Sequence, residues 1–251
     1  MPEKIKTEQG IKDHYQKSDI VDVYEQKRFG NIKRSLAHWL DCDAIEYFIR
    51  KYCDPAGQYL DLACGTGRLT RGVAVRGFNI VSADYSQEML AAAQEKCYRE
   101  NIKSNFVRED AFRLSFPEKH FDGVFTMRFI RHFEYDKRRE LYRQLRRVLN
   151  DKGYLIFDVL NKDVDTKAHE RQAHDETYTL EGITKELREN GFELREMVAG
   201  NVAGVAVVTW AKKWGLMPIG RYWAKKYRGR PEIMKRAAYW MVAAQKAKQY
   251  S

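Results

Sequence analysis

The stretch "YLDLACGTGRLT", residues 59–70, is the part of the sequence that decides the fold. It begins with an apolar run of strand length, passes through Gly65 and Gly67, and leads into the start of a helix. Glycines at these positions permit a tight turn and a close approach of the backbone to a ligand. The helix that follows offers free N–H groups and the positive end of its dipole to an anion. The pattern alone does not choose among the nucleotide-binding classes that use it, and some glycine turns bind no ligand.

Beyond this stretch, apolar runs of strand length alternate with stretches whose apolar residues recur with the period of a helix. Helices are expected from about Gly67, Ser86, Tyr135 and Thr179, and strands at residues 59–63, 78–83, 104–109, 121–127, 153–160 and 192–198. Alternation of this kind requires crossover connections, so it predicts an α/β fold with a mainly parallel sheet and helices on both faces. Before residue 57 the pattern is helical, and Ile45, Phe48 and Ile49 fall on one face.

The residue types around the glycine turn favour one ligand class. A dinucleotide site prefers a third glycine where this chain has Thr70, and the Asp61 carboxylate would repel a pyrophosphate. A ligand with a carboxylate, an ammonium and a sulfonium group has the opposite preference. S-adenosylmethionine therefore suits both the helix end and Asp61, whereas a nicotinamide dehydrogenase does not.

Acidic residues also follow the next two predicted strands. Asp84 ends the second strand, where its carboxylate can accept hydrogen bonds from both ribose hydroxyls, and Tyr85 next to it is assigned to the same site. After the third strand, Asp110 can accept from the adenine amino group while the Ala111 N–H meets a ring nitrogen. Capping of the next helix is the alternative for Asp84, and a solvated loop position is the alternative for Asp110.

Five segments together carry a family resemblance. In order, "YLDLACGTGRLT", "IVSADYSQEML", "VREDAFRLSF", "FDGVFTMRFIRHF" and "LRRVLNDKGYLIFDV" resemble the motifs of class I S-adenosylmethionine-dependent methyltransferases over residues 57–200. The resemblance implies a Rossmann-like, seven-stranded, mainly parallel sheet whose last strand is antiparallel. It also implies a set of cofactor-binding residues: Asp61, Gly65 and Gly67 around the methionine end, Asp84 on the ribose, Asp110 and Ala111 on the adenine, and the Met127 carbonyl near the methionine amine.

Tyr24 and Arg28, in "VYEQKRFG", resemble a pair that closes over the cofactor in relatives, and ordinary packing is the alternative for both. The expected organisation is an N-terminal helical cap over residues 1–56, a methyltransferase core over 57–199 and a basic, Trp-rich segment over 200–251. This last segment is expected to be an insertion before the last strand. That strand is placed at 238–247, with 204–211 as the alternative.

Methyl transfer from a sulfonium requires alignment of the acceptor and exclusion of water, and it needs no nucleophilic residue on the enzyme. His132 follows the fourth strand and is the candidate general base for a hydroxyl acceptor, with simple packing as its alternative. Arg128 and Arg131 flank it and are candidates for gripping a substrate carboxylate or phosphate, although surface residues need no such role.

Several patterns that would point to other chemistry are missing from the sequence. No Asn or Asp followed by two prolines and an aromatic residue comes after the fourth strand, which argues against methylation of exocyclic base amines. No acidic cluster suggests a divalent metal. The cysteines form no CxxC pair, so no zinc site or disulfide framework is expected from Cys42, Cys53, Cys64 and Cys97.

The formal net charge of +10 is concentrated at the C-terminal end. From Val205 onward there are eleven Lys and Arg and one acid, Glu232, whereas the residues before Val205 have 34 of each sign. The same part holds Trp210, Trp214, Trp223 and Trp240. Sequence rich in Trp and Lys suits an anionic membrane surface. A solvated basic face on a packed helix and a nucleic-acid patch are the alternatives.

The opening residues are charged where a secretory signal would be apolar, so we expect a cytoplasmic protein, with peripheral membrane attachment through its basic end. The expected activity is transfer of a methyl group from S-adenosylmethionine to a small or lipid-linked acceptor, at oxygen. Two rivals stay open: an RNA methyltransferase that uses the basic end, and a cofactor-binding module without transfer activity.

Overall fold

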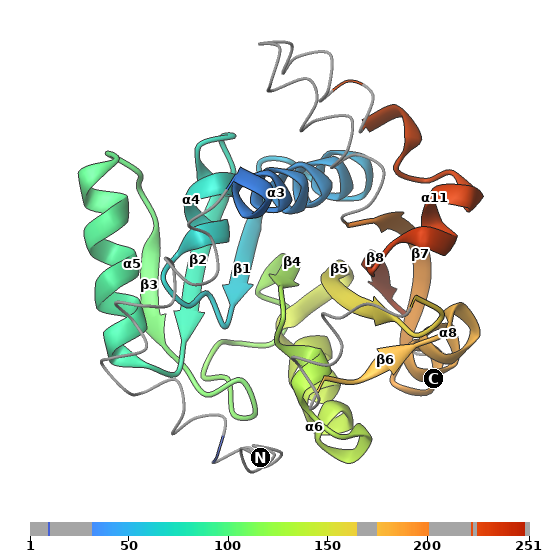
Figure 1. Cartoon of the computed structure of the whole chain (residues 1–251). Helices are drawn as coiled ribbons and strands as arrows, with labels where there is room; N and C mark the ends of the chain where they lie inside the picture. Colours follow the sequence, from blue (N-terminus) through green and yellow to red (C-terminus); the bar gives the residue numbers. More distant parts are fainter. Residues whose placement is uncertain (1–9, 11–31, 165–174, 201–221, 223–224, 249–251) are drawn as a thin grey trace.

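The structure is a computed structural model that describes residues 10, 32–164, 175–200, 222 and 225–248 (Figure 1). The expected segments appear close to their predicted bounds. In chain order the elements are α3 (Ile32–Tyr52), β1 (Gln58–Leu62), α4 (Arg68–Ala74), β2 (Asn79–Asp84), α5 (Gln87–Arg99), β3 (Asn105–Arg108), β4 (Phe121–Thr126), the 3-10 helix η1 (Ile130–His132), α6 (Tyr135–Val148), β5 (Leu149–Asn161), β6 (Thr177–Tyr178), α8 (Leu180–Glu189), β7 (Phe192–Ala199), α11 (Pro231–Arg236) and β8 (Tyr239–Lys246).

One sheet organises these elements, with the strand order β3-β2-β1-β4-β5-β8-β7. The pairs from β3 to β5 are parallel, and β8 runs antiparallel to both of its neighbours, β5 and β7. This arrangement confirms the mainly parallel sheet with an antiparallel last strand. The two-residue β6 pairs with the end of β5 at Leu160 and Asn161, which adds one short strand to the seven expected.

Helices cover both faces of the sheet, as predicted (Figure 1). On one face α3 and α4 enclose a hydrophobic cluster, which includes the fully buried Ile45, Phe48 and Ile49 of the predicted helical stripe. On the other face α6 and α8 enclose a second cluster with the alternate strand residues. Successive side chains of a strand point to opposite faces, so Tyr59 belongs to the first cluster and Leu60 to the second.

The C-terminal strand lies inside the sheet. Its position at Tyr239–Lys246 agrees with the preferred of the two predicted locations, while residues 204–211 lie outside the described residues. Trp240 is a buried core residue of β8, and its indole N–H donates to the Met234 carbonyl at 2.8 Å. The prediction that the tryptophans of this end suit a membrane surface is therefore wrong for Trp240. The other three tryptophans of this end lie outside the described residues.

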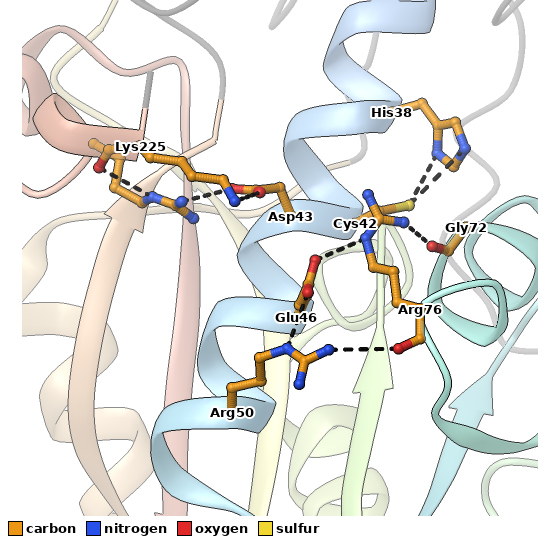
Figure 2. A network of polar contacts seen from close by, with 9 residues as sticks. His38, Cys42, Asp43, Glu46, Arg50, Gly72, Arg76 and Lys225 are labelled. Carbon is orange, nitrogen blue, oxygen red and sulfur yellow. Dashed lines mark hydrogen bonds and ion pairs between the residues drawn. The ribbon is translucent and has the colours of Figure 1, made fainter. Parts of the chain in front are cut away.

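Helix α3 connects parts of the chain that are far apart in sequence (Figure 2). Its Glu46 accepts hydrogen bonds from the Nε of Arg50 and the Nε of Arg76, both at 2.9 Å, which ties the helix to the end of α4. Its Asp43 pairs with Lys225 at 2.8 Å and with Arg228 at 2.5 Å. The segment before α11 is therefore bonded to α3.

Gly67 shows how tightly the glycine turn is constrained, and it gives a test of the fold. Its φ of 73° is left-handed, and a Cβ added there would lie 2.8 Å from the Cβ of Ala93 in α5. We expect Gly67→Ala to lower the free energy of unfolding by about 2 to 4 kcal/mol, because backbone strain adds to overpacking between α4 and α5. Urea unfolding measures the change.

The matched control is Gly65→Ala. Gly65 has a φ of 55°, but a Cβ there would meet no atom within 4 Å. Its replacement should cost about 1 to 2 kcal/mol, from the backbone alone. Equal losses for the two variants would contradict the close approach of α4 and α5.

Candidate active site

A cleft of about 820 Å³, its open mouth included, lies at the carboxyl ends of the central parallel strands. Because these strands are neighbours in the sheet, residues far apart in sequence meet there. The predicted site residues that line the cleft are Gly65 after β1, Asp84 and Tyr85 at the end of β2, Asp110 and Ala111 after β3, and Met127, Arg128 and His132 after β4. The structure thus brings together most of the residues assigned from the sequence.

A smaller cavity of about 380 Å³, its open mouth included, adjoins the cleft and shares Gly65, Met127 and Arg128 with it. This cavity contains Asp61 and Arg68, which do not line the main cleft. Asp61 therefore lies at the end of the site expected for the methionine part of the cofactor. Gly67 lines neither cavity; it is the N-cap residue of α4 and shapes the turn.

The Asp84 carboxylate connects the turns that follow β1 and β2. One oxygen accepts the Gly65 N–H at 2.8 Å, and the other accepts the Ser86 N–H at 3.0 Å. Burial raises the pKa of Asp84, and these two N–H groups act in the opposite direction by stabilising the ionised form. Ser86 caps α5 as predicted, since its hydroxyl accepts the Met89 N–H. The side-chain cap of α5 is therefore Ser86, and Asp84 lines the cleft.

Asp61 is almost fully buried, with 1% of its surface exposed. Its carboxylate accepts a hydrogen bond from the Thr70 hydroxyl at 2.7 Å, and the Thr70 hydroxyl also lies 2.8 Å from that of Ser82. Burial raises the pKa of Asp61 to about 7, against the lowering effects of Thr70 and of the Arg68 charge. Thr70, which stands where a dinucleotide motif has its third glycine, therefore holds the Asp61 carboxylate in place.

The loop after β3 supplies the side expected to hold adenine. The Asp110 carboxylate accepts the Phe112 N–H at 3.0 Å, which fixes the loop at the cleft wall. Ala111 is 8% exposed and lies between them. Asp110 is half-buried and lines the cleft, so it is in the place where the predicted adenine contact would be made.

The 3-10 helix η1 places His132 at the cleft and Arg131 behind it. His132 Nδ1 lies 2.5 Å from Asp175 Oδ1, and Arg131 Nη1 donates to Asp158 Oδ2 at 2.7 Å. Arg128, with a left-handed φ of 58°, donates its backbone N–H to the other oxygen of Asp158. Two carboxylates thus hold the turn that follows β4.

The structure corrects the role predicted for Arg131. Its side chain is 4% exposed, pairs with both Asp158 and Asp175, and is not part of the cleft lining. A guanidinium placed in this way stabilises the turn and is not presented to a substrate anion, whereas Arg128 stays at the cleft. Tyr24 and Arg28, the expected pair over the cofactor, lie outside the described residues.

Asp158 and Asp175 are site residues that the sequence reasoning missed. Asp158 did leave a signal, because a charged residue inside the apolar run "GYLIFDVL" needs a buried partner. Asp175 left none, since it is 43 residues from His132 in sequence. Among the described residues, no group of three or more His, Cys, Asp or Glu side chains could hold a metal ion.

Comparison with known proteins fits this geometry. Residues 60–153 match the family model described as a methyltransferase domain. Over these residues the chain is similar to a methyltransferase domain, which agrees with the resemblance seen in the sequence motifs. The demethylmenaquinone methyltransferase of Thermus thermophilus is 40% identical over 90 residues, which are 34% of this chain and 41% of that protein. The ubiquinone/menaquinone biosynthesis C-methyltransferase UbiE of Ectopseudomonas mendocina is 36% identical over 110 residues, which are 41% of each chain.

Among solved structures, magnesium protoporphyrin IX methyltransferase (ChlM) from Synechocystis PCC 6803 with bound SAH has a TM-score of 0.67 at 15% identity. The similarity covers 96% of this chain and 100% of ChlM, and at this identity it shows the fold alone. The chain spans about half the length of the curated relatives it matches. Among the described residues, no helix is both long and apolar enough to cross a membrane.

The raised pKa of Asp61 predicts a pH dependence of stability. The usual value is 3.8 and the folded value is about 7, so between these values the folded state holds a proton that the unfolded state has lost. Stability conferred by this group is therefore lost as the pH rises from about 4 to about 7.

Asp61→Asn removes this titration. Relative to the wild type, the variant should gain on the order of 2 kcal/mol in the free energy of unfolding between about pH 5 and pH 8. Urea unfolding at both pH values, without cofactor, measures the difference. A difference between the two proteins that does not change with pH would show that Asp61 is ionised throughout.

Proposed function

We propose that this protein transfers a methyl group from S-adenosylmethionine to a small or lipid-linked acceptor, at a hydroxyl oxygen. The observation that carries the proposal is the cleft, because it collects most of the predicted cofactor residues from the ends of four adjacent strands. Solved neighbours of the same fold contain SAH or SAM. The sequence match to a methyltransferase domain supports the same cofactor.

Each part of the cofactor has a suitable partner in this proposal. The Asp84 carboxylate accepts hydrogen bonds from the ribose hydroxyls, and Asp110 with the Ala111 N–H holds the adenine. Gly65 lets the backbone approach the methionine part. Asp61 at the adjoining cavity attracts the ammonium group, and that attraction favours its ionised form.

Methyl transfer then follows as an in-line displacement. The acceptor oxygen forms a bond to the methyl carbon while the carbon–sulfur bond breaks, and the electron pair of that bond goes to sulfur. S-adenosylhomocysteine leaves as a neutral thioether. The hydroxyl proton goes to His132, the titratable side chain that follows β4 at the cleft. Alignment of the two reactants in the cleft supplies most of the acceleration.

The acceptor we propose has a large, mostly apolar body. Phe129 and Phe133 line the cleft beside Arg128, with ring centroids 5.1 Å apart, and Phe112 packs edge-on against Phe133. One relative is named a demethylmenaquinone methyltransferase, and a quinone ring system is of this kind. Arg128 is the cation that can pair with an acidic substituent of such an acceptor.

Methylation at a ring carbon is the second candidate, and the relative named as a quinone C-methyltransferase favours it. The two reactions differ in the product, because O-methylation gives a methyl ether or ester and C-methylation gives a new carbon–carbon bond. Mass spectrometry and NMR of the product distinguish them.

Peripheral attachment of a cytoplasmic enzyme to an anionic membrane is the proposed location. Lys226, Arg230, Lys235 and Arg236 are exposed, and Lys226 lies over the ring of Tyr222, which is 59% exposed. Each basic side chain near an anionic surface contributes about 1 kcal/mol, so a few of them suffice for reversible binding. An RNA footprint is the competing explanation of the same charges.

Replacement of Asp84 tests the cofactor site. Asp84→Ala removes the acceptor for the ribose hydroxyls and for two backbone N–H groups, so binding of S-adenosylhomocysteine should weaken by at least about a hundredfold. Isothermal titration calorimetry measures it, with NAD as the comparison ligand. Asp84→Asn keeps one oxygen acceptor and should lose less.

Unchanged affinity in Asp84→Ala, or tighter binding of NAD, would refute the site. The wild type should also release S-adenosylhomocysteine with aromatic hydroxyl compounds such as quinols. A protein that binds the cofactor and turns over no such acceptor would be the inactive binding module.

The membrane proposal has its own charge test. Neutralising Lys226, Arg230, Lys235 and Arg236 to Gln should reduce sedimentation with phosphatidylserine vesicles by about a thousandfold in partitioning, because about four basic contacts are lost. The matched control neutralises four exposed basic residues elsewhere, Lys103, Arg139, Arg143 and Lys152, and should change it little. Salt-sensitive binding to single-stranded RNA with no vesicle binding would favour the RNA explanation.

A further inference from the structure

Asp175 lies beside the turn that carries His132, although it is distant in sequence. It lies two residues before β6, whose parallel pairing with β5 brings this segment against η1. The neighbouring Glu176 N–H donates to the Arg131 carbonyl at 2.8 Å, which fixes the backbone there. The Asp175 side chain is completely buried. A carboxylate in such a place needs partners for both oxygens.

The two oxygens of Asp175 have different partners. Oδ1 lies 2.5 Å from His132 Nδ1, and Oδ2 forms an ion pair with Arg131 Nε at 3.0 Å. Arg131 is held from its other side by Asp158 at 2.7 Å. The order Asp158, Arg131, Asp175, His132 is therefore a continuous buried chain that ends at the cleft.

We propose that Asp175 is a positioning residue that sets the tautomer of His132, and that Arg131 sets the orientation of Asp175. The proposal rests on the proposed function, in which His132 receives the acceptor proton. A nitrogen that faces a carboxylate oxygen carries the hydrogen, so neutral His132 is protonated at Nδ1. Nε2 then holds the lone pair that can accept a proton.

The same contact serves after the transfer. When Nε2 has taken the acceptor's proton, the imidazolium lies with its Nδ1–H on a carboxylate, which stabilises the charge and keeps the ring in place. No proton moves to Asp175 in this step. Without Asp175, either tautomer is accessible to the ring, and only one of them can act as a base from Nε2.

Arg131 determines which way the side chain at position 175 is oriented, and an amide variant at that position can show this. In Asp175→Asn the side chain has one oxygen and one NH₂ group. The Arg131 guanidinium is positive and can only donate, so the amide oxygen stays on the side of Arg131 and the NH₂ turns to His132. Nδ1 must then accept a hydrogen bond, which moves the ring hydrogen to Nε2. The variant should keep the fold and lose the basic nitrogen.

The experiment reads the tautomer directly. Full-length protein labelled with ¹⁵N-histidine is examined by long-range ¹H–¹⁵N correlation NMR at about pH 8, where an ordinary histidine is neutral. His132→Gln assigns the signals. The wild type should show Nδ1 protonated, and Asp175→Asn should show Nε2 protonated. Calorimetry with S-adenosylhomocysteine should give the same affinity in both, which reports an intact cofactor site.

Asp158→Asn is the matched control, because it replaces a buried carboxylate of the same chain that contacts Arg131 but not His132. It should leave the Nδ1–H tautomer unchanged. An Nε2–H tautomer in the wild type overturns the proposal without any variant being needed. An unchanged tautomer in a folded Asp175→Asn protein also overturns it.

Turnover separates this proposal from the proposed function. With an acceptor that the wild type methylates at oxygen, Asp175→Asn and His132→Ala should each lower kcat by about 10² to 10⁴, with unchanged cofactor affinity. Equal kcat in wild type and Asp175→Asn overturns the positioning role. Failure of the wild type to methylate any acceptor refutes the proposed function, while the tautomer measurement still decides the role of Asp175.

Discussion

The contact on which the rest of the site depends is the one between Asp84 and the backbone of two turns. β1 and β2 are adjacent and parallel, with Leu62 opposite Ala83, so their carboxyl ends meet. A side chain at the end of β2 can therefore reach the turn after β1, and the Asp84 carboxylate accepts N–H groups from Gly65 and Ser86. This bond fixes the spacing between the glycine turn and the start of α5. The part of the cleft lined by Gly65, Asp84 and Ser86 is therefore held in place by this contact.

Most of this frame could be predicted from the sequence because its signals are local. Strand and helix periods appear within ten residues, and helix starts appear within four: Ser86 and Thr179 both cap their helices through the side chain. The location of the cleft followed as well, because parallel neighbours place their carboxyl ends together. Gly65 and Asp110 were thus assigned to one site without any knowledge of the contacts between them.

The rest could not be predicted, because it depends on pairing between distant segments. Arg131 looked like a surface residue beside a polar helix start, and only its burial against Asp158 and Asp175 shows otherwise. The two-residue β6 has too few residues for a periodic signal, yet its pairing with β5 brings Asp175 to His132. A buried charge announces that a partner exists, but the sequence does not say which one.

The charges of the site explain why the cofactor should be a cation. Asp61 is buried and Asp84 is half-buried, and the loss of hydration raises the pKa of each, so their ionised forms are incompletely compensated by the surrounding protein. Arg68, whose charge lowers the pKa of Asp61 from the adjoining cavity, is itself bonded to Asp41 at 3.1 Å. A ligand with an ammonium and a sulfonium group supplies the missing positive charge, and it gains affinity as it restores ionisation. A pyrophosphate would raise both pKa values further and would lose affinity by the same linkage, although the glycine turn is shaped to receive either.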